Sequence, residues 1–155
     1  MSEKFPWSTP EPGQLVARGH PAGDFLEAYE WKVLEERDGY LRIDAHLPAH
    51  VLNPRGQLFG GFTPTYVDLV ALFTVRAGPG RLDPDQPRSW RATTSMHLEY
   101  FEPIVGPRFV MESQLEKRRG RTNFVITRFL QDGELAVLAT TTMRELAPDR
   151  TLGDA

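Results

Sequence analysis

One carboxylate stands alone in an apolar stretch of this sequence. The segment FTPTYVDLVALFTV (62–75) would place apolar residues on every side of a helix, and Asp68 is the only charged residue between Arg55 and Arg76. A helix that is apolar all round is buried all round, and an unpaired buried carboxylate is costly. Asp68 is therefore either a core aspartate bonded to a Thr or Tyr hydroxyl, or a functional acid.

A glycine pair precedes the same helix, at the end of NPRGQLFGG (53–61). Pro64 must lie in the first helical turn, because deeper in the helix it would remove a backbone hydrogen bond. Gly60 and Gly61 then leave bare backbone N–H groups at the positive end of the helix, where an anion or a developing oxyanion is stabilised. The alternative is that the pair only makes a tight turn.

The spacing of these residues suggests a dimer. Gly61 and Asp68 are seven residues apart and share one helix face, about 10.5 Å apart along the axis at 1.5 Å per residue. That distance is too long for both to engage one small reacting group. A second, antiparallel copy of the helix would bring its Asp68 to the glycines of the first. We therefore expect composite sites between two chains.

The elements that position these residues are one long helix and about six strands. An early pair of strands flanks Asp38-Gly39, a tight-hairpin signal, and a short helix is expected to begin with Asp24 as its cap. The long helix is expected over 62–77, and the later strands near 90–102, 106–118, 121–131 and 134–146, joined at Glu102-Pro103, Gly120 and Asp132-Gly133. An antiparallel sheet with one long helix is an α+β fold.

The length and composition of the chain are those of a single ordinary globular domain, and they exclude several classes of protein. The chain has 155 residues, a net charge of −3 and no Cys, which disfavours a nucleic-acid binder, a disulfide framework and any Cys-ligated metal. No apolar run approaches the roughly 18 residues that span a bilayer, and no signal-peptide pattern opens the chain. We expect a cytoplasmic protein with an irregular arm (1–23), a single domain (24–146) and a tail (147–155).

Other candidate sites are weaker. His46 and His50 have the spacing of two ligands on a helix, but Pro48 between them makes a helix improbable, so no metal site is expected. The run KRRGR (117–121) is interpreted in the first place as a solvated hairpin turn. No GxSxG or GxGxxG motif is present, and Tyr100, Phe101 and Pro103 are typical of core and turn positions.

With these residues assembled, the chain resembles the hotdog-fold acyl-CoA thioesterases, and within them the phenylacetic-acid-degradation type of the 4-hydroxybenzoyl-CoA thioesterase-like group. The matching text is HVLNPRGQLFGGFTPTYVDLVALFTV, supported by the strands from YFEPIVGPRFV to TTTMRE, and the similarity covers roughly residues 30–146. The resemblance implies a sheet wrapped around one central helix, a dimer or dimer of dimers with the active site at the subunit interface, an acyl-CoA substrate and no cofactor.

The resemblance also implies roles for particular residues. Asp68 corresponds to the catalytic carboxylate, as nucleophile or as general base on water, and Gly60, with Gly61, to the backbone donors that polarise the thioester carbonyl. Asn53 is similar to the polar residue that positions the water or the carbonyl, and Thr93 falls near a Ser or Thr that lines the site.

One departure from the family pattern concerns the position before the glycine pair, which is commonly His and here is Phe59. Gln57 is a candidate substitute, and Arg118, Arg119 and Arg121 are candidates to meet the phosphates of CoA. Two alternative functions stay open. The first is an acyl-CoA-binding hotdog module with little turnover, and the second is an enoyl-thioester hydratase, which generally requires a catalytic His.

Overall fold

A computed structural model describes residues 8–85 and 89–146. The strands within these residues are β1 (Lys32–Arg37), β2 (Tyr40–His46), β3 (Arg91–Tyr100), β4 (Arg108–Arg119), β5 (Thr122–Gln131) and β6 (Glu134–Glu145). They form one antiparallel sheet in the order β1-β2-β4-β5-β6-β3. The number of strands and their approximate positions confirm the α+β prediction.

The predicted turns connect consecutive strands. Gly39 (φ +68°) and Gly120 (φ +56°) adopt the left-handed backbone that favours glycine, and both residues of Asp132-Gly133 have positive φ. Two consecutive positive φ angles suit the tight hairpin between β5 and β6, because such turns match the twist of the paired strands.

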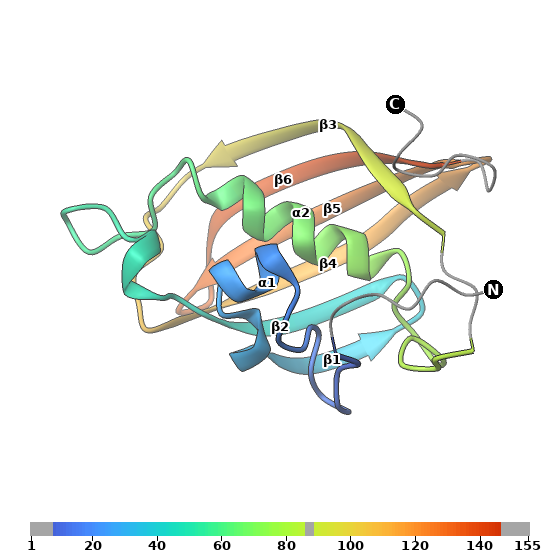
Figure 1. The fold of residues 1–155 in the computed structure, drawn as a ribbon. Helices are drawn as coiled ribbons and strands as arrows, with labels where there is room; N and C mark the ends of the chain where they lie inside the picture. The colour runs from blue at the N-terminus through green and yellow to red at the C-terminus, as the bar shows by residue number, and fades with distance from the viewer. Residues whose placement is uncertain (1–7, 86–88, 147–155) are drawn as a thin grey trace.

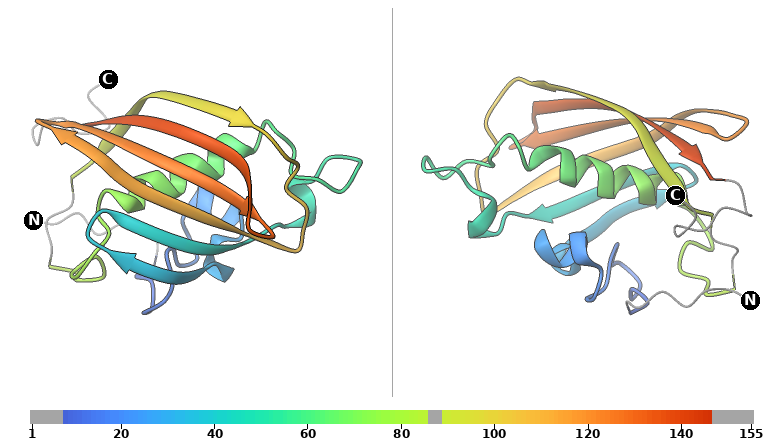
Figure 2. Two further views of the ribbon diagram at one scale, coloured as in Figure 1. Left: turned by 180° about the vertical axis from the view of Figure 1, so that it is seen from behind. Right: turned by 45° about the horizontal axis from the view of Figure 1, so that its top comes forward.

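The long helix, α2 (Thr63–Thr74), crosses the concave face of the sheet. Figure 1 shows the sheet curving behind α2, with the short helix α1 (Pro21–Phe25) on the side of α2 toward β1 and β2. Figure 2, seen from behind, shows that among the described residues the other face of the sheet consists of strands alone. Within the same residues, no helix is long and apolar enough to cross a lipid bilayer.

Aromatic rings fill the core between α2 and the sheet. Tyr66 of α2 is fully buried; it stacks on Trp31 (ring centroids 5.6 Å apart) and meets Phe109 edge-on (5.3 Å). Phe109 in turn contacts Phe129 of β5 (5.2 Å). These rings fix the rotation of α2 against the sheet, and so determine which face of the helix stays open.

The expectation that α2 is buried on every side is wrong for the single chain. Thr65, Asp68 and Leu72, which recur at helical spacing, are only half-buried, whereas Val67, Val70 and Ala71 are fully buried. The sheet and α1 cover one side of the helix and leave this stripe open. The apolar positions of α2 are thus mostly buried, and the stripe that no described part of the same chain covers contains Asp68.

The short N-terminal helix differs from the sequence prediction. It spans α1 (Pro21–Phe25) and begins three residues before Asp24. The N-cap is His20, whose Nδ1 accepts a hydrogen bond from Gly23 N–H (3.1 Å), while the Asp24 carboxylate accepts from Gly19 N–H. Pro21 at the first helical position sets this start, because its fixed φ suits the first turn and it has no N–H to leave unpaired.

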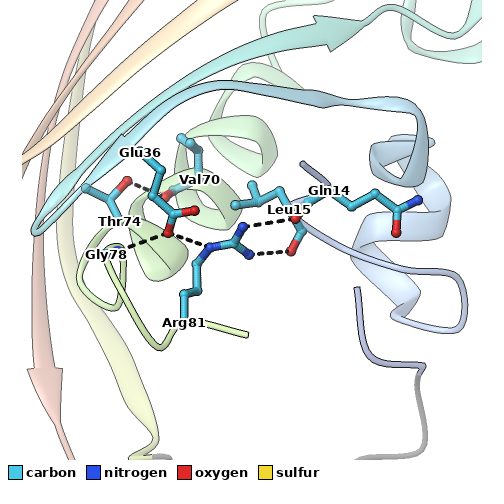
Figure 3. A network of polar contacts seen from close by, with 7 residues as sticks. All are labelled: Gln14, Leu15, Glu36, Val70, Thr74, Gly78 and Arg81. Atoms are coloured by element: carbon cyan, nitrogen blue, oxygen red, sulfur yellow. Dashed lines mark hydrogen bonds and ion pairs between the residues drawn. The ribbon is translucent and has the colours of Figure 1, made fainter. Parts of the chain in front are cut away.

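The described part of the segment expected to be an irregular arm is built into the core. Leu15 and Val16 are buried, and the buried Arg81 ties them to the rest of the chain (Figure 3). Its Nε donates to Glu36 of β1 (2.7 Å) and its Nη2 to the carbonyl of Gln14 (3.0 Å). Residues 1–7, with Phe5 and Trp7, and the expected tail 147–155 lie outside the described residues.

Candidate active site

Two backbone N–H groups are open at the start of α2. Phe59 N–H donates to Val51 and Phe62 N–H to Phe59 (both 2.9 Å), so the chain on either side of the glycine pair is held in place. Within residues 8–85 and 89–146, the N–H groups of Gly60 and Gly61 have no protein acceptor. Both glycines are exposed and lie at the positive end of the helix, so they can donate to an added ligand.

An aromatic ring lies against each of these glycines. A Cβ on Gly61 would come within 2.7 Å of the Phe59 ring, and one on Gly60 within 3.8 Å of the Tyr100 ring. The Tyr100 hydroxyl also donates to the Gly60 carbonyl (2.7 Å). Phe59 continues into a row of rings, since it meets Phe62 edge-on (5.5 Å) and Phe62 meets Phe25 (5.4 Å). The glycine pair thus lies in an aromatic, half-exposed environment.

Asp68 accepts a hydrogen bond from the hydroxyl of Thr93 on β3. The contact depends on a bulge, because the register with β6 shifts between Thr93 and Ser95. Thr93 lies opposite the buried Met143, and cross-strand partners share a face, so Thr93 points to the inner side of the sheet. Leu98 and Met96 also point to the inner side, and if every second residue of β3 continued to do so, the next one would be Thr94 and not Thr93. The bulge therefore turns Thr93 toward the helix.

The carboxylate and the glycine pair do not meet within one chain. Asp68 pairs with Thr93 near the beginning of β3, while Gly60 pairs with Tyr100 at its end. Figure 1 shows why: β3 runs opposite to α2, so the end of the strand lies beside the start of the helix. No hydrogen bond joins Asp68 to either glycine among the described residues.

Asn53 and Gln57 belong to a projecting loop. Asn53 Oδ1 accepts hydrogen bonds from the backbone N–H groups of Arg55 (2.9 Å) and Gln57 (3.0 Å), and its amide is 3.5 Å from Gln57 Oε1. The loop extends from the molecule beside the start of α2 (Figure 1). In this chain the Asn53 oxygen shapes its own loop, as asparagine does in an Asx turn.

The three arginines of the β4–β5 hairpin lie at the other end of α2. Arg118 donates to Asn123 Oδ1 (2.9 Å) and to the carbonyl of Val75 (3.2 Å), which follows the last turn of the helix. A cation at that end satisfies an orphan carbonyl and the helix dipole. Arg119 and Arg121 are exposed. The structure does not bring the hairpin to the glycine pair of the same chain.

The two central histidines have separate partners. His46 Nε2 lies 3.5 Å from Glu27 Oε2, and His50 Nε2 lies 2.5 Å from the carbonyl of Phe25. Within residues 8–85 and 89–146, no group of three or more His, Asp or Glu side chains is placed to hold a metal ion.

Solved structures share this arrangement of sheet and helix. A putative thioesterase, a phenylacetic acid degradation-related protein from Ralstonia eutropha, superposes with a TM-score of 0.65 at 22% identity, covering 83% of this chain and 92% of that chain. A mutant of the phenylacetic acid degradation protein PaaI from Thermus thermophilus gives 0.61 at 23% identity, covering 79% and 99%. This chain has the hotdog fold.

A third hotdog structure carries a ligand. It is a hypothetical thioesterase protein from Streptococcus pneumoniae with coenzyme A, which matches with a TM-score of 0.62 at 15% identity over 76% of this chain and 87% of that one. No protein-family model matches the sequence, nor does any curated protein. The fold that the sequence resemblance implied is therefore confirmed by structure alone.

The residue that sequence reasoning missed in this hotdog domain is Tyr100, which it assigned to a core or turn position. Tyr100 is 51% exposed and bonds to a glycine forty residues away in the chain. Aromatic and turn residues at a strand end are common, so no local signal distinguishes this one. Its inward direction follows only from its place opposite the buried Val137 of β6.

Proposed function

We propose that this hotdog protein hydrolyses a small-molecule acyl-CoA to the free acid and CoA. The observation that carries the proposal is the half-buried Asp68, held by Thr93 on the open face of α2, together with two unpaired N–H groups at the start of the same helix. The hotdog thioesterase structures named above, one of them with coenzyme A, support the substrate class.

Thioester hydrolysis suits these groups. The carbonyl oxygen gains negative charge in the transition state, and amide donors fixed at a helix start stabilise it without reorganisation. Asp68 either removes a proton from the attacking water or attacks the carbonyl carbon itself. In the first route water adds to the carbonyl carbon, the C–S bond breaks, and the proton taken by Asp68 passes to the CoA thiolate. In the second route an anhydride between Asp68 and the acyl group forms as the C–S bond breaks, and water then hydrolyses it and restores the carboxylate. In both routes one water supplies the hydroxyl of the acid and the proton of the CoA thiol.

The proposed site is shared between two chains. One chain supplies Asp68 and the other supplies Gly60 and Gly61, because the two groups are separated along α2 within each chain. Two features of the single chain support a homodimer or a dimer of dimers. The half-buried stripe of α2 lies open, and β3, which holds Thr93, is an edge strand whose free side can pair with another strand.

Further residues are assigned by their position. Asn53 would contact the water or the carbonyl from the projecting loop through its Nδ2, because its Oδ1 already accepts two backbone hydrogen bonds. Gln57 would contact the same group, and Phe59 would contact the acyl group beside Gly61. Arg119 and Arg121, which are exposed, are the arginines of the hairpin available to CoA phosphates, whereas Arg118 is engaged with the end of α2.

The direct test is free-thiol release from a panel of short, medium, long and aromatic acyl-CoAs. Asp68→Asn removes the carboxylate function while keeping the size of the side chain, so kcat should fall at least about 100-fold on the preferred substrate. Asp132→Asn is the matched control: Asp132 is exposed in the β5–β6 turn at φ +51°, a conformation that Asn accepts. Equal rates for Asp68→Asn and the wild type would refute the assignment.

A second function is favoured by Phe59. An apolar, half-exposed ring lies beside Gly61, so a carbonyl donor that relatives of this type commonly carry is absent. A protein that binds acyl-CoA with no thiol release across the panel would be a binding module. Crotonyl-CoA in the same panel tests the hydratase alternative, since hydration removes its double bond without releasing thiol.

A further inference from the structure

We propose that Tyr100 is a positioning residue that aims the Gly61 N–H at the substrate carbonyl. The inference rests on the proposed thioesterase function and adds to it a residue that acts through the backbone. Its basis is the hydrogen bond from the Tyr100 hydroxyl to the Gly60 carbonyl (2.7 Å).

The geometry follows from the planarity of one peptide bond. The Gly60 carbonyl and the Gly61 N–H belong to the same trans peptide unit, so they point in opposite directions. A hydroxyl that fixes the direction of the carbonyl therefore fixes the direction of the N–H. That N–H has no protein acceptor among the described residues, so it is directed at space that a ligand can occupy.

A glycine pair needs such an anchor more than other sequences do. Neither residue has a side chain to restrict its backbone, and the nearest backbone bonds lie outside the peptide in question, at Phe59 and Phe62. The ring of Tyr100 adds a second contact, 3.8 Å from the position of a Cβ on Gly60. Without the hydroxyl, the peptide could rotate, and the donor would have to be reoriented during each reaction.

Tyr100 itself stands on a rigid part of the sheet. It is the last residue of β3, opposite Val137 of β6, which is 1% exposed. The chain just after it is also fixed, because the N–H groups of Phe101 (2.8 Å) and Glu102 (3.2 Å) both donate to the Ala136 carbonyl. Because β6 fixes Tyr100, and Tyr100 bonds to the Gly60 carbonyl, β6 helps to fix the direction of the Gly61 N–H at the start of α2.

The hydrogen bond has an electronic consequence as well. A donor on the Gly60 carbonyl polarises the whole amide, and hydrogen bonds in such a chain strengthen one another. The Gly61 N–H therefore becomes a better donor to a developing oxyanion. Since its own proton is directed at Gly60, Tyr100 acts through the peptide and not on the substrate.

The experiment compares Tyr100→Phe with Tyr40→Phe. Tyr100→Phe keeps the ring and removes only the hydroxyl. Tyr40 alternates with the core-facing Leu41 on β2, and its hydroxyl donates to none of the described residues, so Tyr40→Phe is the matched control. We expect Tyr100→Phe to lower kcat about tenfold with KM nearly unchanged, because the loss concerns a donor that acts in the transition state.

A second readout follows the carbonyl directly. A ketone analogue of the acyl-CoA, with CH₂ in place of sulfur, binds without being cleaved, and its C=O stretch reports how strongly the site polarises it. The stretch should lie at lower frequency in the wild type than in Tyr100→Phe, and Tyr40→Phe should match the wild type.

The possible outcomes distinguish the role of Tyr100 from the proposed thioesterase function. Wild-type turnover with equal kcat and equal C=O frequency in Tyr100→Phe overturns the role of Tyr100 alone. A fall in kcat with an equal rise in KM and a lower melting temperature also overturns it, because that pattern indicates a structural role. A wild type that neither hydrolyses the panel nor binds the analogue overturns the proposed function and this inference with it.

Discussion

Thr93 holds the carboxylate that the proposed chemistry needs. Its hydroxyl donates to Asp68 Oδ1, and the bulge at Thr94 turns it to the inner face of the sheet. A carboxylate on a helix has several rotamers, and a hydrogen bond from a separate strand selects one of them. Selection of one rotamer fixes the direction in which the reacting carboxylate points.

Thr93→Val should lower kcat about tenfold, because the side chain keeps its shape and loses only the donor to Asp68. Thr94→Val is the neighbouring control, since the Thr94 hydroxyl donates to the backbone carbonyl of Thr142 and not to the site. Steady-state kinetics on the preferred acyl-CoA measure both. Equal rates for Thr93→Val and Thr94→Val would contradict the role of the Thr93 contact.

The sequence predicted some of these residues and not others, for a physical reason. Asp68 and the glycine pair are visible because their local context is unusual: a lone charge in an apolar helix, and bare amides before it. Thr93 was expected at the site through the family resemblance alone, and Tyr100 was not expected there. Their contacts cross twenty-five and forty residues. Such contacts depend on sheet register and on a bulge, which local spacing does not encode.

The start of α1 is set by a residue other than the one that the sequence predicted. The N-cap of this helix is His20, whereas the sequence pattern predicted Asp24. Asp is a preferred N-cap residue and His is not, so residue type alone favours Asp24; Pro21 decides for His20, because it fixes where the first turn begins. The strands and turns, by contrast, were predictable, because alternation and glycine positions are local signals.

The His20 cap makes stability depend on pH. Burial lowers the pKa of His20 below its ordinary value of 6.5, so the folded protein binds this proton less readily than the unfolded chain. The contribution of His20 to the free energy of unfolding is therefore complete above its ordinary pKa, and it is lost as the pH falls through the pKa that His20 has in the folded protein.

The variant His20→Asn tests this, because it keeps a capping oxygen that does not titrate. Urea unfolding from about pH 7.5 to about pH 5 should show the free energy of unfolding falling more in the wild type than in His20→Asn; parallel curves would contradict this.

The Arg81 network joins the N-terminal segment, β1 and the loop after α2 (Figure 3). The side chain of Arg81 is 4% exposed and that of Glu36 is 22% exposed, so removing the cation leaves a carboxylate in a desolvated place. Arg81→Met should lower the free energy of unfolding by about 3 kcal/mol. Arg37→Met, in the exposed pair with Glu35, should lower it by less than about 1 kcal/mol. Equal losses in urea denaturation would show that the network contributes no more than a surface pair.

At the scale of the whole molecule, the single chain leaves the proposed site open. The sheet wraps one side of α2, while the stripe that contains Asp68 stays half-exposed and β3 stays an edge strand. In the sequence this stripe carries Thr65, Asp68 and Leu72, so the lone carboxylate was its visible mark. In the proposed dimer, a second copy of the chain would cover both features with one two-fold interface.

Mixed dimers test the composite site most directly. Asp68→Asn removes the carboxylate of one chain. Gly61→Pro removes the N–H donor from the other; this N–H has no acceptor among the described residues, and Gly60 before it tolerates the restriction that proline imposes. The Phe59 ring of the same chain has to turn away from the new Cβ, which changes only the site that already lacks the donor. Each variant alone should be inactive in thiol release, with its dimer intact by size-exclusion chromatography.

When the two variants are unfolded together and reassembled in equal amounts, half of the dimers carry one chain of each kind. Each such dimer has one site with Asp68 from one chain and Gly61 from the other. Thiol release should therefore recover to about a quarter of the wild-type rate. A mixture no more active than its two separate components would contradict a site shared between chains.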